Sequence, residues 1–258
     1  MAGIATNTAV GNGVLGAITT GAGNTTVGNS AGAVITTGTN NTILGYLAGT
    51  ALVDGSENVL IGSGGKALTS GGNNVMVGFN AGLVNTTGTK NTYVGWTAGR
   101  SGSQNTAIGA QSLQSVTGTG NTALGQFAGL GNTSGAGNIY LGFNAGSYAT
   151  TQSNQLILTS LDCTNYAGEQ TKAILYGQQT LTTASQILTV NGNLGINNIS
   201  PAATAVVDIT STTKGFLPPR MTTTQRTAIT SPAEGLCVYD LTLHKLFIYD
   251  GSLWQAAF

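Results

Sequence analysis

The chain has 258 residues, and its composition is that of a protein that folds rather than of a disordered linker. Hydrophobic residues make up 40% of the sequence and charged residues only 6%, whereas disordered chains are normally rich in charge and poor in β-branched residues. The formal net charge is zero and there is no basic run, so we expect no nucleic-acid partner and no binding to anionic membranes.

The first 158 residues are built from a short motif that begins with Asn and recurs about every seventeen residues. The motif is Asn, then usually Thr or Val, a variable residue, an aliphatic residue and Gly, as in NTTVG from Asn24. The leading residues are Asn7, Asn24, Asn41, Asn58, Asn74, Asn91, Asn105, Asn121 and Asn138, with a frayed tenth copy from Asn154. These steps are too short for helical repeats of about thirty residues, so they predict a parallel β-solenoid or β-roll of nine to ten coils.

The second and fourth residues of the motif share one face if the segment is extended, because side chains alternate along a strand. The fourth position is always aliphatic, so we expect it to form the core column: Val10, Val27, Leu44, Ile61, Val77, Val94, Ile108, Leu124 and Leu141. The Gly that follows predicts a sharp bend in each coil. These residues are Gly11, Gly28, Gly45, Gly62, Gly78, Gly95, Gly109, Gly125 and Gly142.

A second corner is predicted where several copies carry Ala-Gly, as in Ala31-Gly32 and Ala48-Gly49. The leading Asn recurs at one corner, so its amides are expected to stack from coil to coil as a hydrogen-bonded ladder. A coil of about seventeen residues encloses little volume, and we expect the small corners to leave room that partner chains fill.

The NTxxG motif followed by Ala-Gly resembles the repeats of viral fibre proteins and, more distantly, the left-handed parallel β-roll heads of trimeric autotransporter adhesins. The resemblance covers about 150 residues. Because both kinds of protein assemble as homotrimers, it implies a homotrimer here.

After Asn154 the period stops, and the sequence predicts a transition or stalk β segment over 159–213 and a C-terminal domain over 214–258. Residues 173–200 alternate apolar and polar side chains around Asn-Gly-Asn, a hairpin or strand-turn signal. Further on, the sequence predicts a Thr N-cap followed by a helical turn from Gln225 to Ile229. Strands are predicted at 236–240 and 245–250, with Asp250-Gly251 turning into a last strand that carries Trp254.

The segment from Gly215 to Trp254, which contains GFLPPRMTTTQR and GLCVYDLTLHKLFIYDGSLW, resembles the ending of many phage and phage-like tail and fibre proteins. Leu241 and His244 stand where Thr and Asn are more usual, which alters only the hairpin loop. The resemblance implies a structural virion protein that is assembled in the host cytoplasm and exposed on the virion surface. Its implied partners are other virion structural proteins and a host surface receptor, with a glycan as one candidate.

Catalytic, cofactor-binding and metal sites are not expected. The repeat offers only Asp54 and Glu57 as a carboxylate pair, His244 is the only His, and Cys163 and Cys237 have no ligand-like neighbours. The N-terminus lacks a signal-peptide pattern, and no apolar run approaches the ~18 residues of a membrane span, so neither classical secretion nor membrane insertion is expected. We therefore expect the chain not to be an enzyme.

Aromatic residues occur at repeat positions that we expect to face outward, where they serve either inter-chain contact or a sugar-binding groove. The candidate surface or inter-chain contacts are Tyr93, Trp96, Tyr140, Phe143 and Trp254. The leading hypothesis is a tail or head fibre that mediates attachment to the host surface, and the alternative is a cell-surface trimeric adhesin. An ice-binding face is disfavoured because Val59, Val75 and Ile139 interrupt the Thr column at the second motif position, which fits an inward face better. Which end of the chain points outward stays open.

Overall fold

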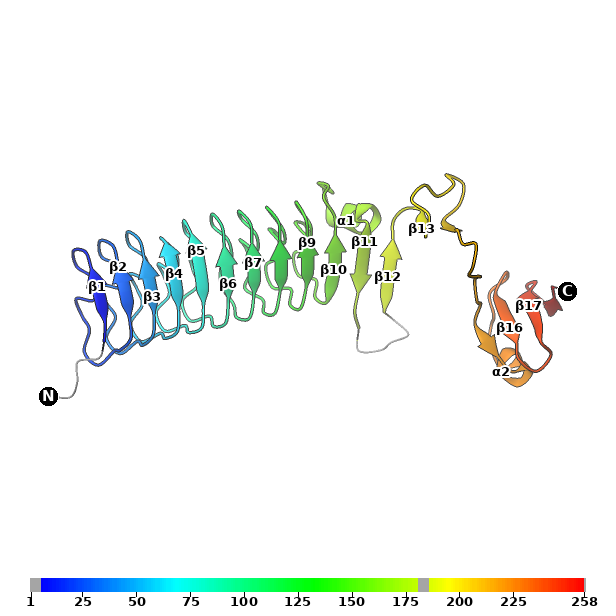
Figure 1. The fold of residues 1–258 in the computed structure, drawn as a ribbon, viewed down its shortest axis with the longest axis horizontal. Coiled ribbons are helices and arrows are strands. Elements are labelled where there is room, and N and C mark those ends of the chain that lie inside the picture. Colours follow the sequence, from blue (N-terminus) through cyan, green and yellow to red (C-terminus); the bar gives the residue numbers. More distant parts are fainter. Residues whose placement is uncertain (1–5, 181–185, 258) are drawn as a thin grey trace. The chain divides into compact units, whose positions relative to one another are not determined.

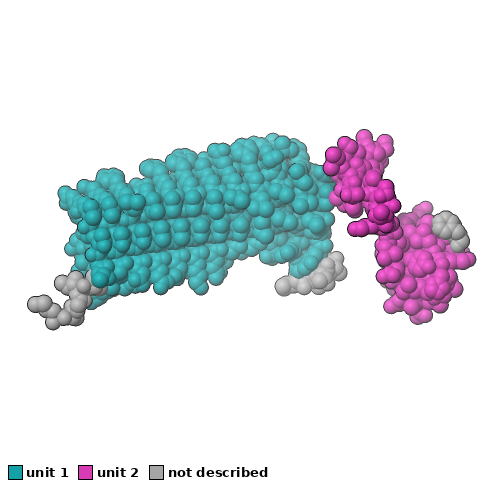
Figure 2. Space-filling view, in the orientation of Figure 1, with its two compact units in different colours: residues 1–192 teal, residues 193–258 magenta. Residues whose placement is uncertain are grey.

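The computed structural model describes residues 6–180 and 186–257. Residues 1–5, 181–185 and 258, which belong to the three segments predicted from the sequence, lie outside the described residues. The chain divides into two compact units, residues 1–192 (unit 1) and 193–258 (unit 2), shown in different colours in Figure 2. The division falls inside the segment 159–213 that the sequence set apart.

Unit 1 is a ladder of short strands, one from each copy of the motif, that pair in parallel with the next copy along the chain (Figure 1). Equivalent motif positions lie opposite each other, as in the pairs Thr25 with Thr42 and Ile43 with Leu60. The strands are β1 (Thr8–Val10), β2 (Thr25–Val27), β3 (Thr42–Leu44), β4 (Val59–Gly62), β5 (Val75–Gly78), β6 (Thr92–Val94), β7 (Thr106–Ile108), β8 (Thr122–Leu124), β9 (Ile139–Leu141) and β10 (Gln155–Leu158). The parallel β-solenoid is confirmed, and its register is set by the motif.

The frayed tenth copy begins one residue later than the sequence indicated. Ile157 pairs with Tyr140 and Leu156 with Ile139, which places Gln155, and not Asn154, at the leading position of the motif. The step from Asn138 to Gln155 therefore equals the step from Asn121 to Asn138. An Asn immediately before a Gln made the two possible registers indistinguishable by sequence alone.

The Gly that closes each motif sits at a corner where two coils approach closely. Gly45 has φ +134, and a Cβ built on it would collide with the carbonyl oxygen of Gly62 in the next coil. Any larger residue would therefore meet both a conformational penalty and a clash with the neighbouring backbone.

The core column is the third motif position, and the prediction that the fourth position forms the core is wrong. Among the third-position side chains, Ile43, Leu60 and Met76 are at most 1% exposed, whereas Leu44 and Leu124 at the fourth position are 46% and 51% exposed. The predicted alternation of side chains along the strand is correct, but the face predicted to be buried is the exposed one. The reason is the leading Asn, which is buried in the coils of β2–β9, so that the first and third positions point inward together.

The small Ala-Gly corners are filled by the chain itself, so the expectation that partner chains fill them is also wrong. A Cβ on Gly49 would lie 2.8 Å from a methyl group of Leu60, and a Cβ on Gly82 would collide with the sulfur of Met76. The third-position side chains thus reach across each coil to the second corner. Each coil encloses its own core.

Unit 1 ends in a change of strand direction. After β10 the chain forms the helix α1 (Tyr166–Lys172), which begins at the N-cap Asn165 and contacts β11 (Leu175–Gln178). Strand β11 pairs antiparallel with β10, and β12 (Ile187–Val190) pairs antiparallel with β11. The parallel stacking of coils therefore stops at β10.

Unit 2 contains a two-stranded and a four-stranded sheet. Strands β13 (Leu194–Ile196) and β14 (Val207–Ile209) pair in parallel. The larger sheet has the order β15 (Arg220–Met221), β16 (Cys237–Asp240), β17 (Lys245–Tyr249) and β18 (Trp254–Ala256), with α2 (Thr223–Thr227) between β15 and β16.

The hairpin and the last strand of unit 2 lie where the sequence predicted them. The helical turn starts earlier than predicted, because Thr222 is the N-cap and forms a reciprocal capping box with Gln225. Within residues 6–180 and 186–257, no helix is long and apolar enough to cross a membrane.

Candidate interaction surfaces

The leading Asn side chains form a ladder of amides inside unit 1. Asn41 donates through Nδ2 to Asn24 Oδ1 at 2.9 Å and to the carbonyl oxygen of Gly55 at 2.9 Å, while its backbone N donates to the same Asn24 oxygen at 3.0 Å. Asn58, Asn74, Asn91, Asn121 and Asn138 repeat these bonds. The buried amides are thereby satisfied from coil to coil.

The ladder has a defined end at Gln155. Its backbone N donates to Asn138 Oδ1 at 2.9 Å, as an Asn would, but its own Oε1 accepts from the hydroxyl groups of Tyr166 at 2.7 Å and Tyr176 at 2.5 Å. These two tyrosines come from α1 and β11, the elements that follow the last coil. Their hydroxyl groups therefore donate to Gln155 Oε1 in place of the donors that a further coil would supply.

A buried carboxyl lies close to this end. Glu169 of α1 has no exposed surface, and its Oε1 accepts from the backbone N of Tyr148 at 2.9 Å. Oε2 has no hydrogen-bond partner among the described residues. Burial raises the pKa of Glu169 to about 7, although the hydrogen bond from the Tyr148 backbone N opposes the rise. The protonated form is therefore favoured up to neutral pH.

The second and fourth motif positions of β2–β9 point away from the core, and we call this surface the outer face. It carries no charged side chain in any of these strands. Leu44, Leu124 and Ile139 are between 43% and 51% exposed. The Thr column lies on it too, with Thr25, Thr42 and Thr122 exposed, so the interpretation that these Thr residues face inward is wrong. An uncharged face with a column of exposed aliphatic side chains beside a column of mostly Thr side chains is a candidate interaction surface.

Two of the five aromatic candidates are not surface residues. Tyr93 and Tyr140 occupy the buried third position and have no exposed surface, so their prediction as surface or inter-chain contacts is wrong for the same reason as the core column. Burial raises the pKa of both hydroxyl groups. Trp96 and Phe143 are 51% and 43% exposed and directly follow the motif Gly.

The fifth candidate, Trp254, is half-buried in unit 2. Its ring lies 5.5 Å from that of Tyr249, and the Arg226 guanidinium lies 5.5 Å from its centroid. Arg226 also stacks on the Phe247 ring at 3.8 Å and forms a buried ion pair with Asp240, Nε to Oδ2, at 3.0 Å. Trp254 therefore packs against the side chains around the Arg226–Asp240 pair, with part of its ring left exposed.

Asp240 organises this part of unit 2. Burial alone would raise its pKa, but hydrogen bonds from Thr223, the backbone N of Leu243, Arg226 and the backbone N of Thr242 outweigh burial and lower the pKa to about 2. The carboxylate thus ties α2 to the β16–β17 loop in its charged form.

One coil of unit 1 is shorter than the others. The step from Asn91 to Asn105 is shorter than the step from Asn74 to Asn91, 14 against 17 positions along the sequence. Here Tyr93 fills the core, and its hydroxyl donates to the carbonyl oxygen of Ser101 at 2.9 Å. Asn105 keeps the backbone bond to Asn91 Oδ1 and the bond to the Gly118 carbonyl oxygen, but its Nδ2 donates to the Ser101 carbonyl oxygen instead of to Asn91. Tyr140 occupies the same buried position in a coil of ordinary length, so the Tyr side chain fits both kinds of coil.

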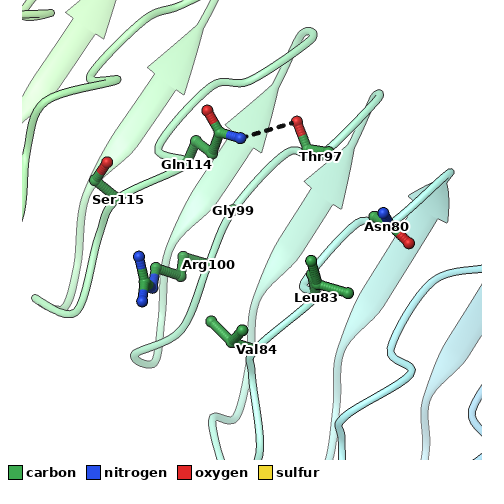
Figure 3. Close-up of a pocket in the computed structure, with 8 residues that line it drawn as sticks. All are labelled: Asn80, Leu83, Val84, Thr97, Gly99, Arg100, Gln114 and Ser115. Atoms are coloured by element: carbon green, nitrogen blue, oxygen red, sulfur yellow. Dashed lines mark hydrogen bonds between the residues drawn. The ribbon is translucent and has the colours of Figure 1, made fainter.

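A surface depression, which we call the notch, opens over this short coil between its two longer neighbours (Figure 3). It has a volume of about 260 Å³. Its lining includes Asn80, Leu83, Val84, Arg100, Gln114 and Ser115. Sequence reasoning missed the notch, although the short step from Asn91 to Asn105 was the signal that could have located it.

The notch combines one cation with neutral polar groups. Arg100 is exposed and makes neither an ion pair nor a side-chain hydrogen bond with any residue that the structure describes. Gln114 donates to Thr97 Oγ1 at 3.4 Å and accepts from Gln111 at 2.8 Å, which holds its amide in place. No cluster of three or more His, Cys, Asp or Glu side chains suited to a metal ion lies in the described parts of the chain.

Comparison with known proteins bears on unit 2. Residues 195–258 match the family described as the phage tail like trimerisation region, and this stretch includes Gly215 to Trp254. No curated protein and no solved structure matches the chain. The match indicates a structural protein of the phage tail-fibre type and supports assembly as a homotrimer.

Exposed apolar residues in the matched region agree with an assembling unit. Ile199, Val206, Phe216, Leu217 and Leu253 are all more than 60% exposed in the single chain. Side chains of this size are expected to be covered when copies associate.

Proposed function

We propose that the chain forms a homotrimeric, non-catalytic fibre on the virion surface, a tail or head fibre, and that this fibre attaches the particle to the host surface. The observation that carries the proposal is the match of residues 195–258 to a phage tail trimerisation region in a chain whose other unit is a β-solenoid. Other virion structural proteins hold the fibre, and a host receptor is its distal partner.

The outer face supplies the contact between the three solenoids. Trimerisation through residues 195–258 raises the effective concentration of the other units for one another. The outer face is then the surface best suited to pack against its copies, because it is uncharged, carries exposed aliphatic side chains beside the Thr column and is repeated along β2–β9. Burial of its half-exposed aliphatic side chains stabilises the assembly.

Two measurements test the homotrimer and its place on the virion separately. Light scattering of the purified chain should give three times the chain mass of 25.8 kDa, and the mass of one chain would contradict the homotrimer. Immunogold electron microscopy should show the chain on virions. Labelling of a cell surface and not of particles would instead favour the trimeric adhesin.

Host attachment has its own test. The purified trimer should compete with virions for adsorption to host cells, and a heat-unfolded sample should not. Failure to compete, with virions labelled and the trimer intact, would remove the attachment role and leave a purely structural fibre.

A further inference from the structure

The notch is the place where the repeat departs from its own pattern, and it differs chemically from the rest of unit 1. Residues 6–158 contain only three basic side chains, Lys66, Lys90 and Arg100, and only Arg100 lines the notch. The two acidic residues of the same stretch, Asp54 and Glu57, belong to an earlier coil, and Arg100 forms no ion pair with any described residue.

We propose that the notch binds one acidic sugar unit of a host surface polysaccharide, with Arg100 pairing with the sugar carboxylate. This rests on the host-attachment function proposed above. A guanidinium presents parallel N–H donors that match a carboxylate in a bidentate, charge-assisted pair. Since no described residue takes up these donors, they are free for a ligand.

The remaining lining suits the rest of a sugar ring. Leu83 and Val84 of the preceding coil are 41% and 40% exposed and offer an apolar side. Ser115 of the following coil offers a hydroxyl, and Gln114 offers an amide whose position is fixed by Thr97 and Gln111. Figure 3 shows Arg100 lying between Val84 and Ser115, so the cation stands between the apolar and the polar sides. In a pyranose ring one face is more apolar than the other, and hydroxyl groups lie around the rim. Leu83 and Val84 can contact the apolar face, while Gln114 and Ser115 can bond to the hydroxyl groups.

Size and charge narrow the ligand class. At about 260 Å³ the notch lies just under the roughly 300–1,000 Å³ of sites for drug-sized ligands, which fits a single ring with its neighbours in solvent. The notch holds one basic side chain, Arg100, and the chain has zero net charge. A polyphosphate or a nucleic acid requires several basic contacts, so neither fits this site. The notch is also built from residues outside the second and fourth motif positions, so it does not belong to the outer face.

The test is isothermal titration calorimetry on the full-length trimer at low ionic strength. The probes are trigalacturonate and 3′-sialyllactose, each with a neutral counterpart, the methyl ester of trigalacturonate and lactose. We expect at least one acidic probe to bind about tenfold more tightly than its neutral counterpart, because the neutral probe cannot form the charge-assisted pair.

Three variants locate the binding. Arg100→Gln should weaken binding of the acidic probe about tenfold, and Ser115→Phe, which fills the notch but keeps the charge, should weaken it by at least as much. Lys90→Gln removes one positive charge outside the notch and should change affinity less than about twofold. Each variant is first checked for an unchanged trimer mass and circular dichroism spectrum, and loss of the trimer in Arg100→Gln would overturn the proposal by placing Arg100 in the interface.

The proposal is wrong if neither acidic probe binds, if acidic and neutral probes bind equally, or if Arg100→Gln binds as tightly as the natural chain. These outcomes do not touch the attachment role. If the natural trimer blocks virion adsorption and Arg100→Gln blocks it equally well, attachment stands and the notch is not its site.

Discussion

The two units bury polar groups in opposite ways. Unit 1 stacks the same neutral amide from Asn24 to Asn138, and, except at Asn105, each side-chain amide donates to the amide oxygen of the coil before it. Unit 2 relies on one buried ion pair, Arg226 with Asp240, surrounded by hydrogen bonds. A repeated neutral bond distributes stability along the stack, whereas a single charged pair concentrates it. Unit 1 should therefore tolerate local damage better than unit 2.

The largest effect is expected from Asp240→Leu. The substitution leaves the buried Arg226 without a counter-ion and strands donors on Thr223, Thr242 and Leu243. Removing one partner of a buried ion pair is strongly destabilising. We expect unit 2 to unfold at room temperature and the trimer to be lost, as measured by hydrogen exchange and light scattering. A stable trimer in this variant would show that the pair is dispensable.

A break in the amide ladder should destabilise unit 1 locally without unfolding the whole unit. Asn74→Leu removes bonds to Asn58 and Gly88 and strands the two donors of Asn91 that point at Asn74. We expect a loss of ~4 kcal/mol in the free energy of unfolding of unit 1, with the coils on either side still protected from hydrogen exchange. Asn12→Leu, which changes an exposed Asn of the first coil, serves as the control and should leave the free energy of unfolding nearly unchanged. Loss of protection along the entire ladder would contradict distributed stability.

The two units should also respond to pH in opposite directions. The pKa of Glu169 is raised from 4.5 to about 7, so the folded state holds its proton more tightly than the unfolded chain, and unit 1 should lose stability as pH rises from about 4.5 to about 7. The loss is at most ~3 kcal/mol. The pKa of Asp240 is lowered from 3.8 to about 2, so unit 2 should lose stability as pH falls through that range.

Hydrogen exchange at the end of unit 1 measures the first effect. Tyr140, Tyr148, Cys163 and Tyr166 are the titratable groups that interact with Glu169, and none of them is expected to change charge below pH 7. Glu169→Gln should therefore abolish the pH dependence between 4.5 and 7. Persistence of that dependence in the variant would assign it to another group.

The smallest effect is expected on the outer face. Leu124→Ala removes part of a side chain that is 51% exposed in the single chain. It should weaken association by about 1 kcal/mol per protomer and leave the monomer fold unchanged, as followed by analytical ultracentrifugation. Val53→Ala, at a side chain that is 39% exposed but outside the outer face, should leave association unchanged. Equal effects of the two variants would remove the outer face from the interface.

The architecture of unit 1 could be predicted from the sequence because the motif repeats its own register. Which face of each strand points to the core could not be predicted in the same way, because the strands carry apolar side chains on both faces, as in Val59, Leu60 and Ile61 of β4. The buried Asn was the clue, since an amide ladder needs the first motif position to point inward. Because Asn was interpreted as a corner residue, the core column was predicted on the wrong face of the strands. Tyr93 and Tyr140 were predicted at the surface for the same reason.

The notch and the end of the ladder were harder to foresee. The short step from Asn91 to Asn105 indicated an irregular coil, but only the structure shows Tyr93 filling the core and Arg100 left without a partner among the described residues. Likewise, nothing in the sequence near Gln155 shows that Tyr166 and Tyr176 close the ladder, because these contacts join residues 11 and 21 positions apart through a change of strand direction. Repeats predict what recurs, and exceptions depend on contacts between non-equivalent positions.

The closure of the ladder at Gln155 makes the stack modular in length. Apart from the coil that begins at Asn105, every inner coil offers the same oxygen forward and the same donors backward, so a whole coil of about seventeen residues can be inserted or deleted while both ends keep their partners. In the short coil, by contrast, the Nδ2 bond from Asn105 to Asn91 is replaced by a bond to the Ser101 carbonyl oxygen. Copy number, rather than new folding information, then sets the reach of unit 1, and related chains of different length can be formed by duplication alone.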